Sequence, residues 1–199
     1  MLTEDNPAQK IMLILLKDLS SSNTVTSLAK ELHITRVGAW KTLKKLEKDE
    51  LIMLNQIGNG RTSIYTIKLN WNNILIKKTL TLYLAQESLK YKKWQFNFSN
   101  LEAQVDFLIL YGSILHSPKE AKDIDILNIA NDKNLNEINN IIIKIQKTQS
   151  KKIHSINLTQ KEFKEELKKS NKAFIDAIKK GIVLFGQEKF INFIRNLKS

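Results

Sequence analysis

The sequence contains no cysteine, which excludes disulfide bonds and metal sites built on thiolates. Its longest apolar run, Ile11 to Leu16, is far too short to span a membrane. The N-terminus carries Glu4 and Asp5 and lacks a cationic segment followed by a cleavable apolar one, so no signal peptide is expected. Internal repeats and low-complexity blocks are missing as well. We therefore expect a cytoplasmic protein without a membrane partner.

Positive charge is what the sequence has in excess. Its 199 residues include 32 Lys and Arg against 20 Asp and Glu, a formal net charge of +12. Such an excess indicates a polyanionic partner such as nucleic acid, although a general abundance of lysine, asparagine and isoleucine would also produce it. A hydrophobic content of 42% is sufficient for a packed core. The length suits one large domain or two small ones.

Residues 1–70 show the pattern of a winged helix-turn-helix domain. Asp5-Asn6-Pro7 combines an N-cap with a proline in the first helical turn. Gly58, Asn59 and Gly60 are turn formers that tolerate positive φ. The predicted elements are helices over residues 7–20, around Leu28 and over 36–46, and strands over 51–54 and 64–69. Three helices followed by a hairpin is the order of a winged helix, and we expect double-stranded DNA as its partner.

The third helix of this domain carries the predicted DNA contacts. Ala39, Leu43 and Leu46 fall on one face and are expected to pack inward. The segment ITRVGAWKTLKKLEKDELI resembles the recognition segment of biotin-repressor-type winged helices, and departs from it at Glu50, where glycine is common. The predicted DNA-binding residues are Thr35, Arg36, Lys41, Lys44, Lys45 and, on the wing, Arg61. A protein–protein module with a solvated lysine face is the alternative.

Residues 71–95 are predicted to connect two domains. Ile74 to Leu89 suits a helix, and Leu75, Leu82 and Leu89 recur at seven-residue steps. This stripe predicts an interdomain helix or a homodimer contact.

A second pattern with chemical meaning lies between residues 105 and 127. An apolar run leads into Gly112-Ser113, and a polar connection leads to Asp123-Ile124-Asp125-Ile126. Alternation places both carboxylates on one face of a strand, about 6.5 Å apart. Carboxylates at this spacing are able to converge on one hard cation such as Mg²⁺. Gly112 lets the backbone approach a phosphate, and the Ser113 hydroxyl is able to donate to it.

Gly-Ser followed by Asp-x-Asp resembles the nucleotidyltransferase superfamily, the polymerase-beta-like fold, over roughly residues 96–199. The late segment AFIDAIKKGIVLFGQEKF resembles the C-terminal part of its small archaeal-type members. The resemblance implies an α/β (α+β) domain with a mixed sheet flanked by helices. It also implies that Asp123 and Asp125 bind Mg²⁺ or Mn²⁺ and that Gly112 and Ser113 hold a nucleoside triphosphate. The arginine-glycine that often follows the Gly-Ser turn in this family is missing here, and Lys119 and Lys122 are the nearest basic replacements for contact with the phosphates.

One element of the family pattern is missing. Active members carry a third acidic residue on the next strand, whereas residues 147–160 of this chain contain neither Asp nor Glu. His154 on that predicted strand, over 152–159, is either a replacement general base or a histidine satisfied by its neighbours. His33 and His116 are isolated and do not indicate a zinc site.

Two functions therefore stay open. The first is a divalent-metal-dependent nucleotidyltransferase that moves a nucleoside monophosphate from an NTP to a hydroxyl acceptor and carries a DNA-binding winged helix. The second is a DNA-binding transcriptional regulator or antitoxin-like protein whose nucleotidyltransferase-like domain binds a nucleotide or a partner without turnover. The intact Gly-Ser and Asp-x-Asp favour the first, which is the main interpretation, and the missing carboxylate and the fused winged helix favour the second.

Overall fold

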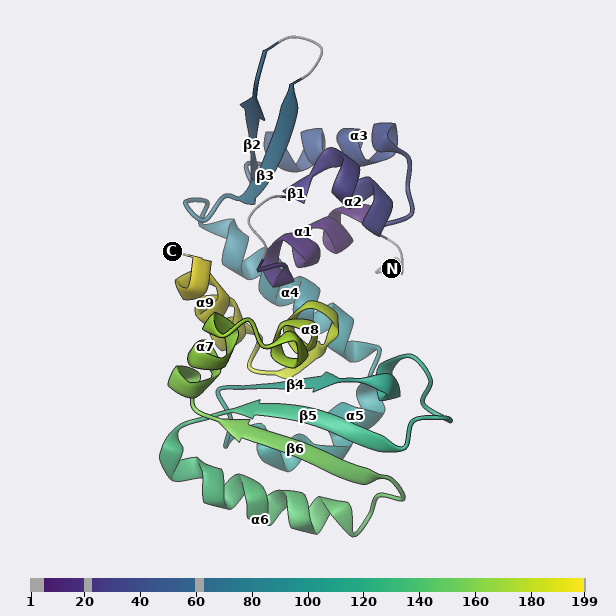
Figure 1. Cartoon of the computed structure of the whole chain (residues 1–199), viewed down its shortest axis with the longest axis vertical. Coiled ribbons are helices and arrows are strands. Elements are labelled where there is room, and N and C mark those ends of the chain that lie inside the picture. The colour runs from purple at the N-terminus through teal and green to yellow at the C-terminus, as the bar shows by residue number, and fades with distance from the viewer. Residues whose placement is uncertain (1–5, 20–22, 60–62, 199) are drawn as a thin grey trace. The chain divides into compact units, whose positions relative to one another are not determined.

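The computed structural model of the chain describes residues 6–19, 23–59 and 63–198 (Figure 1). The chain divides into two compact units, residues 1–83 and 84–199. The division falls between Tyr83 and Leu84, inside the helix α4 (Leu75–Leu89) and within the residues predicted to be a connector.

The first unit combines helices with a small antiparallel sheet whose strand order is β1-β3-β2. Its elements are α1 (Pro7–Lys17), β1 (Asn23–Thr24), α2 (Val25–Glu31), α3 (Arg36–Lys48), β2 (Ile52–Ile57) and β3 (Ile64–Leu69). This is the winged-helix order that the sequence predicts. Two details differ: the short strand β1 was not expected, and β2 continues to Ile57, because its pairing with β3 extends as far as Ile57 opposite Ile64.

Side-chain caps explain where these helices begin. Asn6 accepts a hydrogen bond of 3.0 Å from the N–H of Ala8, and Pro7 opens α1. Thr35 caps α3, because its hydroxyl oxygen accepts a 3.0 Å bond from the N–H of Gly38. The predicted end of the first helix at residue 20 is wrong. The helix stops at Lys17, because Asp18 takes an extended conformation after its N–H bonds to the carbonyl of Ile14.

Among the described residues, three helices are followed, two positions after their last residue, by a residue that is not glycine but has a positive φ. His33, Glu50 and Ser170 have φ values of 54°, 55° and 56°. After α3, the N–H of Glu50 donates to Glu47 and the N–H of Leu51 donates to Leu46, each at 2.9 Å. This pair of hydrogen bonds forms a Schellman motif, in which glycine is the usual left-handed residue. The turn from helix to wing therefore forms without the glycine that the sequence lacks at position 50.

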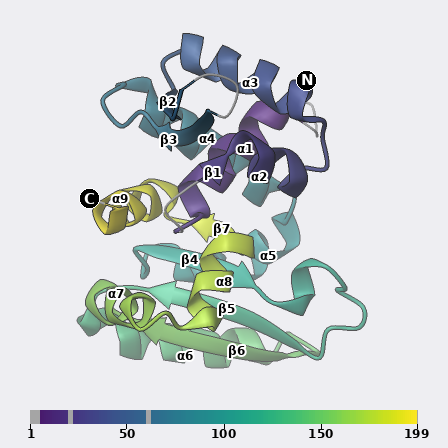
Figure 2. The same cartoon turned by 45° about the horizontal axis from the view of Figure 1, so that its top comes forward.

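The second unit is built on a mixed sheet with strand order β6-β5-β4-β7. Its β5 and β6 run parallel and its other pairs antiparallel. The elements after α4 are α5 (Lys92–Asn97), β4 (Phe107–Tyr111), β5 (Asp123–Ile129), α6 (Leu135–Gln146), β6 (Lys152–Leu158), α7 (Gln160–Lys168), α8 (Lys172–Lys180), β7 (Ile182–Phe185) and α9 (Gln187–Lys198). Figure 2 shows α6 on one side of the sheet and α8 on the other. A mixed sheet flanked by helices was the predicted architecture.

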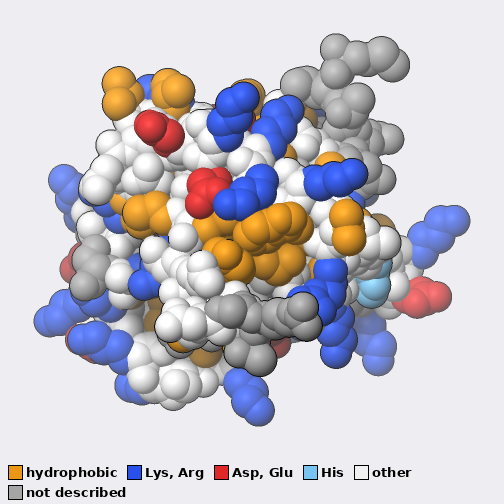
Figure 3. All heavy atoms as spheres, turned by 90° about the horizontal axis from the view of Figure 1, so that it is seen from above, with side chains coloured by type: hydrophobic (Ala, Val, Ile, Leu, Met, Phe, Trp, Pro, Cys, Tyr) orange, Lys and Arg blue, Asp and Glu red, His pale blue; other side chains and the backbone are white. Residues whose placement is uncertain are grey.

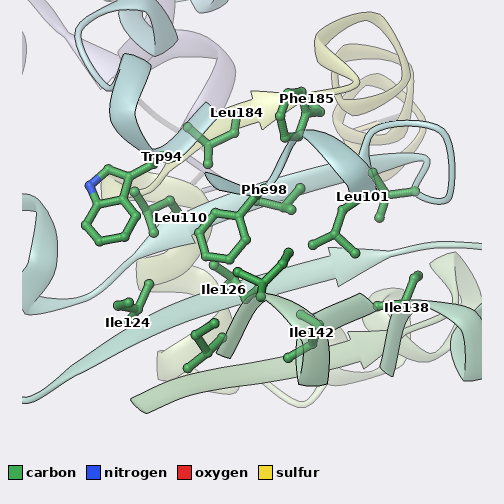
Figure 4. Packing of buried hydrophobic residues seen from close by; sticks show 14 of the residues in the cluster. Trp94, Phe98, Leu101, Leu110, Ile124, Ile126, Ile138, Ile142, Leu184 and Phe185 are labelled. Carbon is green, nitrogen blue, oxygen red and sulfur yellow. The ribbon is translucent and has the colours of Figure 1, made fainter. Parts of the chain in front are cut away.

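An apolar core fills the space between the sheet and α6 (Figure 4). Leu110, Ile124 and Ile126 point from β4 and β5 toward Ile138 and Ile142 of α6, and all five are buried. Burying one such side chain contributes about 1.5–3 kcal/mol to folding. Because the strand period is two, this burial commits Asp123 and Asp125 to the opposite face of the sheet.

A cluster of phenylalanines covers part of that opposite face. Phe107 of β4 lies 6.3 Å from Phe163 of α7, and 5.4 Å from each of Phe190 and Phe193 of α9, between ring centroids. Phe163 also packs on Phe174 of α8. The helices α7, α8 and α9 are thereby held to the sheet at the Phe107 end of β4, four residues from Tyr111.

The connector helix α4 buries a different stripe from the one that seven-residue spacing suggests. Ile76, Leu80 and Leu84 are buried, whereas the predicted stripe of Leu75, Leu82 and Leu89 is exposed. The stripe is thus available to a partner. The short helix α5 was not predicted, because its sequence, KKWQFN, shows no helical apolar period.

Candidate functional site

The turn after β4 brings Gly112 against a carboxylate of the next strand. Gly112 has φ 83° and ψ −164°, a left-handed backbone that favours glycine. A Cβ atom added there would lie 2.2 Å from Asp125 Oδ2. Only glycine therefore allows the Gly-Ser turn and Asp125 to occupy neighbouring positions, as the predicted phosphate and metal sites require.

Asp123 and Asp125 share one face at the start of β5, and Asp125 pairs across the sheet with Tyr111. Burial raises the pKa of the Asp125 carboxyl above its ordinary value, and the charge of Asp123 raises it further, while His154 opposes both effects. Burial and the same two carboxylates raise the pKa of the Tyr111 phenol to about 12, which keeps it protonated at neutral pH. The pair is thus a site where negative charge is concentrated.

His154 lies beside both carboxylates. It sits on β6, in parallel register opposite Asp125, and its Nδ1 lies 3.2 Å from Asp123 Oδ2 and 3.5 Å from Asp125 Oδ1. Within the described ranges these three residues form a group whose potential ligand atoms all lie within 4.8 Å of one another. His33 and His116 are not part of it. The place at which the sequence lacks a third carboxylate therefore holds an imidazole.

These donors fit a divalent cation. Two carboxylate oxygens and one imidazole nitrogen converge, and each of the three side chains is partly exposed, so that an ion has access from solvent. Carboxylates and imidazole are both common ligands of divalent metals in proteins. The cluster would hold the ion directly beside the Gly112-Ser113 turn.

Lys151, which no sequence pattern singles out, bonds to the loop between β4 and β5. Lys151 Nζ donates to the carbonyl of Lys119 at 3.3 Å and also to the carbonyl of Ala121. These bonds tie the loop to the start of β6, close to the cluster in register. Lys122, predicted to bind phosphate, is exposed and directly precedes Asp123. Ser113 is exposed at the start of a 3₁₀ turn over Ser113–Leu115.

The predicted DNA contacts of α3 lie on its outward face. Ala39, Leu43 and Leu46 are buried as predicted, and Arg36, Lys41, Lys44 and Lys45 are exposed. The Lys44 Nζ lies 2.8 Å from Glu47 Oε2 and 4.9 Å from the centre of the Trp40 ring, so part of its charge is compensated within the helix. Trp40 itself is half-buried and packs against Tyr65 in a tilted arrangement, with 4.9 Å between ring centroids. Arg61 lies outside the described residues.

Basic side chains are also numerous on the face that is seen from above. Figure 3, viewed from above, shows lysines and arginines around an apolar patch, with few acidic side chains between them. No helix in the described part of the chain is long and apolar enough to cross a membrane.

Comparison with known proteins gives little. No family model matches the chain, and no curated protein matches it. Among solved structures, the adhesin competence repressor AdcR of Streptococcus pyogenes has 19% sequence identity, covers 50% of this chain and 69% of its own, and gives a TM-score of 0.36. ZitR of Lactococcus lactis, a zinc-responsive MarR family member, has 21% identity, covers 49% and 66%, and gives 0.34. TM-scores this low carry no argument about fold or function.

Proposed function

We propose that the protein is a DNA-binding regulator whose N-terminal unit contacts double-stranded DNA through α3 and the wing. The observation that carries this proposal is the division of α3 into two faces. Its apolar residues are buried, and Arg36, Lys41 and Lys45 face solvent on a helix of the length that enters a major groove. Thr35 supports it, because a hydroxyl that accepts from Gly38 still has its own hydrogen to donate to a phosphate.

The test is equilibrium binding of the full-length protein to double-stranded DNA selected from a random pool. Phosphate contacts make log K fall with log[salt], and each lost contact reduces the slope by about 0.9. The variant Lys41→Glu, Lys45→Glu is expected to weaken binding and flatten the slope. Lys133→Glu, Lys144→Glu, two exposed lysines of the second unit, is the control with the same change of charge. Equal binding by both variants at 50–200 mM salt, about the range where such contacts appear, would refute the proposal.

We further propose that the second unit binds a nucleoside triphosphate together with a divalent metal at Gly112, Ser113, Asp123 and Asp125. The close approach of Gly112 to Asp125 favours this, because it sets a phosphate cradle beside the anionic pair. The metal would supply charge neutralisation and orientation for the phosphates. Backbone N–H groups at the turn and the Lys122 ammonium would hold the phosphate tail.

Nucleotidyl transfer is the activity that such a site would support. The acceptor hydroxyl oxygen bonds to the α-phosphorus, the bond to pyrophosphate breaks, and the hydroxyl proton leaves to a base. His154 is close enough to the carboxylates to act either as that base or as a metal ligand. Without transfer, the same site would act as a nucleotide sensor for the DNA-binding unit.

Incubation with each labelled NTP, Mg²⁺ or Mn²⁺ and DNA, RNA or protein acceptors separates these outcomes. Transfer that Asp125→Asn abolishes would establish the enzyme. Nucleotide binding that Asp125→Asn weakens, with no transfer to any acceptor, would assign the unit to sensing. No nucleotide binding by the parent protein would reject both.

We also propose that two copies pair along α4. Leu75, Leu82 and Leu89 are exposed at the seven-residue period of helices that wrap around an identical partner. A second copy of the chain is therefore the occupant that matches the stripe.

A further inference from the structure

We infer that His154 is a metal ligand through Nδ1, and that the site of Asp123, Asp125 and His154 selects a first-row transition-metal ion over Mg²⁺. The inference rests on the metal site proposed above and names the class of ion that it takes. It gives the imidazole the position of a third ligand and not that of the proton acceptor.

The distances match three ligands around one ion. Metal–ligand bonds of about 2.1 Å place neighbouring ligand atoms about 3.0 Å apart in octahedral geometry and about 3.4 Å apart in tetrahedral geometry. His154 Nδ1 lies 3.2 Å and 3.5 Å from one oxygen of each carboxylate. A small movement of these side chains would bring all three donors within bonding distance of a shared ion.

The backbone around His154 fixes this position from two sides. Parallel pairing with β5 sets His154 opposite Asp125. From the end of α6, the Gln146 side chain accepts a 2.8 Å bond from the N–H of Ile153 and donates a 3.0 Å bond to the carbonyl of Lys151. Gln146 thus bonds to the backbone of Lys151 and Ile153 and fixes the start of β6 just before His154. The imidazole is placed by the fold and not by a mobile loop.

Ligand chemistry decides which ion is preferred. Mg²⁺ takes oxygen ligands and binds imidazole poorly, whereas Mn²⁺, Co²⁺ and Zn²⁺ accept a nitrogen beside carboxylates with rising affinity. Two carboxylates alone would leave Mg²⁺ competitive. Replacing a third carboxylate by an imidazole removes one negative charge and adds one nitrogen, and both changes disfavour Mg²⁺ relative to a transition metal.

The competing interpretation is that a protonated His154 serves as a built-in cation in place of a metal. The same short distances to Asp123 and Asp125 would then belong to an ion pair. The two interpretations differ in whether metal binds and in what a carboxylate at position 154 does, so direct metal binding separates them.

The experiment measures metal affinity of the full-length protein without nucleotide. Co²⁺ is followed by its visible absorption, Mn²⁺ by the loss of its free-ion paramagnetic resonance signal, and Mg²⁺ by competition against Mn²⁺. The parent protein is expected to bind Co²⁺ at least about a hundredfold more tightly than Mg²⁺. The variant His154→Asp is expected to reduce that preference at least about tenfold, with a loss of the nitrogen contribution to the Co²⁺ spectrum. His154→Ala is expected to weaken the binding of both Co²⁺ and Mg²⁺.

His116→Ala is the matched control, because His116 is exposed in the loop between β4 and β5 and lies outside the cluster. It is expected to leave the affinities unchanged, and circular dichroism checks that every variant is folded. If His154→Asp and His154→Ala keep the parent's preference while Asp125→Asn loses metal, the metal site stands and the role of His154 is overturned. If the parent protein binds none of these ions, the metal site itself is rejected and the ion-pair interpretation holds.

Discussion

The outward face of α3 and the cluster on β5 and β6 both gather charged side chains, but they do so in different ways. On α3 the charges come from one continuous segment, and the helical period alone separates them from the buried Ala39 and Leu43. In the cluster, Asp125 and His154 are 29 positions apart and meet only because two strands pair in one register. A surface formed by one helix tolerates single substitutions. A site assembled from two paired strands depends on the backbone positions around it.

The two regions also differ in how their charges are solvated. Arg36, Lys41 and Lys45 are exposed, so water and salt screen their repulsion. Asp123 and Asp125 are partly buried side by side, and burial together with the charge of Asp123 raises the pKa of Asp125. The first surface suits the proposed contact with DNA along its length, and the second suits the proposed binding of a single cation.

The largest effect is expected from Gly112→Ala, which changes the backbone beside the cluster of Asp123, Asp125 and His154. The added methyl group would displace the Asp125 carboxylate, and metal affinity should fall about 10- to 100-fold, as when the support of a ligand is lost. Gly58→Ala is a close control, because Gly58 has φ 84° but its added methyl would make only an ordinary 3.8 Å contact with the Cα of Ser63. Both variants should lose about 1–2 kcal/mol of stability in urea unfolding, and only Gly112→Ala should lose metal.

The next effect concerns the exposed stripe of α4. Leu82→Glu with Leu89→Glu should convert a dimer into a monomer, because two like charges would face their counterparts in the partner helix. Analytical ultracentrifugation measures the change. Ile143→Glu, an equally exposed apolar residue on α6, is the control. A parent protein that is already monomeric at high concentration would contradict the pairing.

Helix caps allow an equal perturbation of both units. Thr35 caps α3 and Thr159 caps α7, each through its hydroxyl oxygen. Replacing either by alanine should cost about 1 kcal/mol of stability in urea unfolding. Thr35→Ala should also weaken DNA binding, whereas Thr159→Ala should leave it unchanged. Equal DNA affinity in the two variants would separate Thr35 from the DNA-binding surface.

The smallest effect is a pH-dependent one at Asp125. Its folded pKa is raised above the ordinary value of 3.8, so the carboxyl supports folding fully below that pH and loses this contribution as pH rises through the folded pKa. In metal-free protein with chelator present, Asp125→Asn should therefore raise the melting temperature slightly at pH 7. The gain should vanish below pH 3.8. A gain that is constant over this range would argue against a raised pKa of Asp125.

Local patterns let much of the fold be predicted from the sequence. The strand at Ile64–Leu69 matches its predicted bounds, and α3 begins at Arg36 as predicted. Asn6 and Pro7 were recognisable as the start of α1 from their residue types alone. The two-residue strand β1 is too short to show any period, and it exists only through pairing with β3.

The candidate site was predictable only in part. Gly112, Ser113, Asp123 and Asp125 form one motif in the sequence. The contact of His154 with both carboxylates depends on where the crossover through α6 returns the chain, and no local pattern encodes this. The loop contact of Lys151 is hidden for the same reason, because its acceptors are backbone carbonyls some thirty residues earlier.

The three residues with positive φ after helices are positions at which a substitution should raise the thermal stability of the protein. His33, Glu50 and Ser170 each hold a backbone conformation that costs a residue with a side chain about 1–2 kcal/mol. Glycine would remove that strain. It would also cost about 0.4–1 kcal/mol of stability, because glycine gives the unfolded chain more conformational entropy. A triple glycine variant should therefore melt at a higher temperature, and its three positions lie outside both the metal cluster and the basic face of α3. Such a thermostable form would serve crystallisation and long assays, and calorimetry would measure the gain.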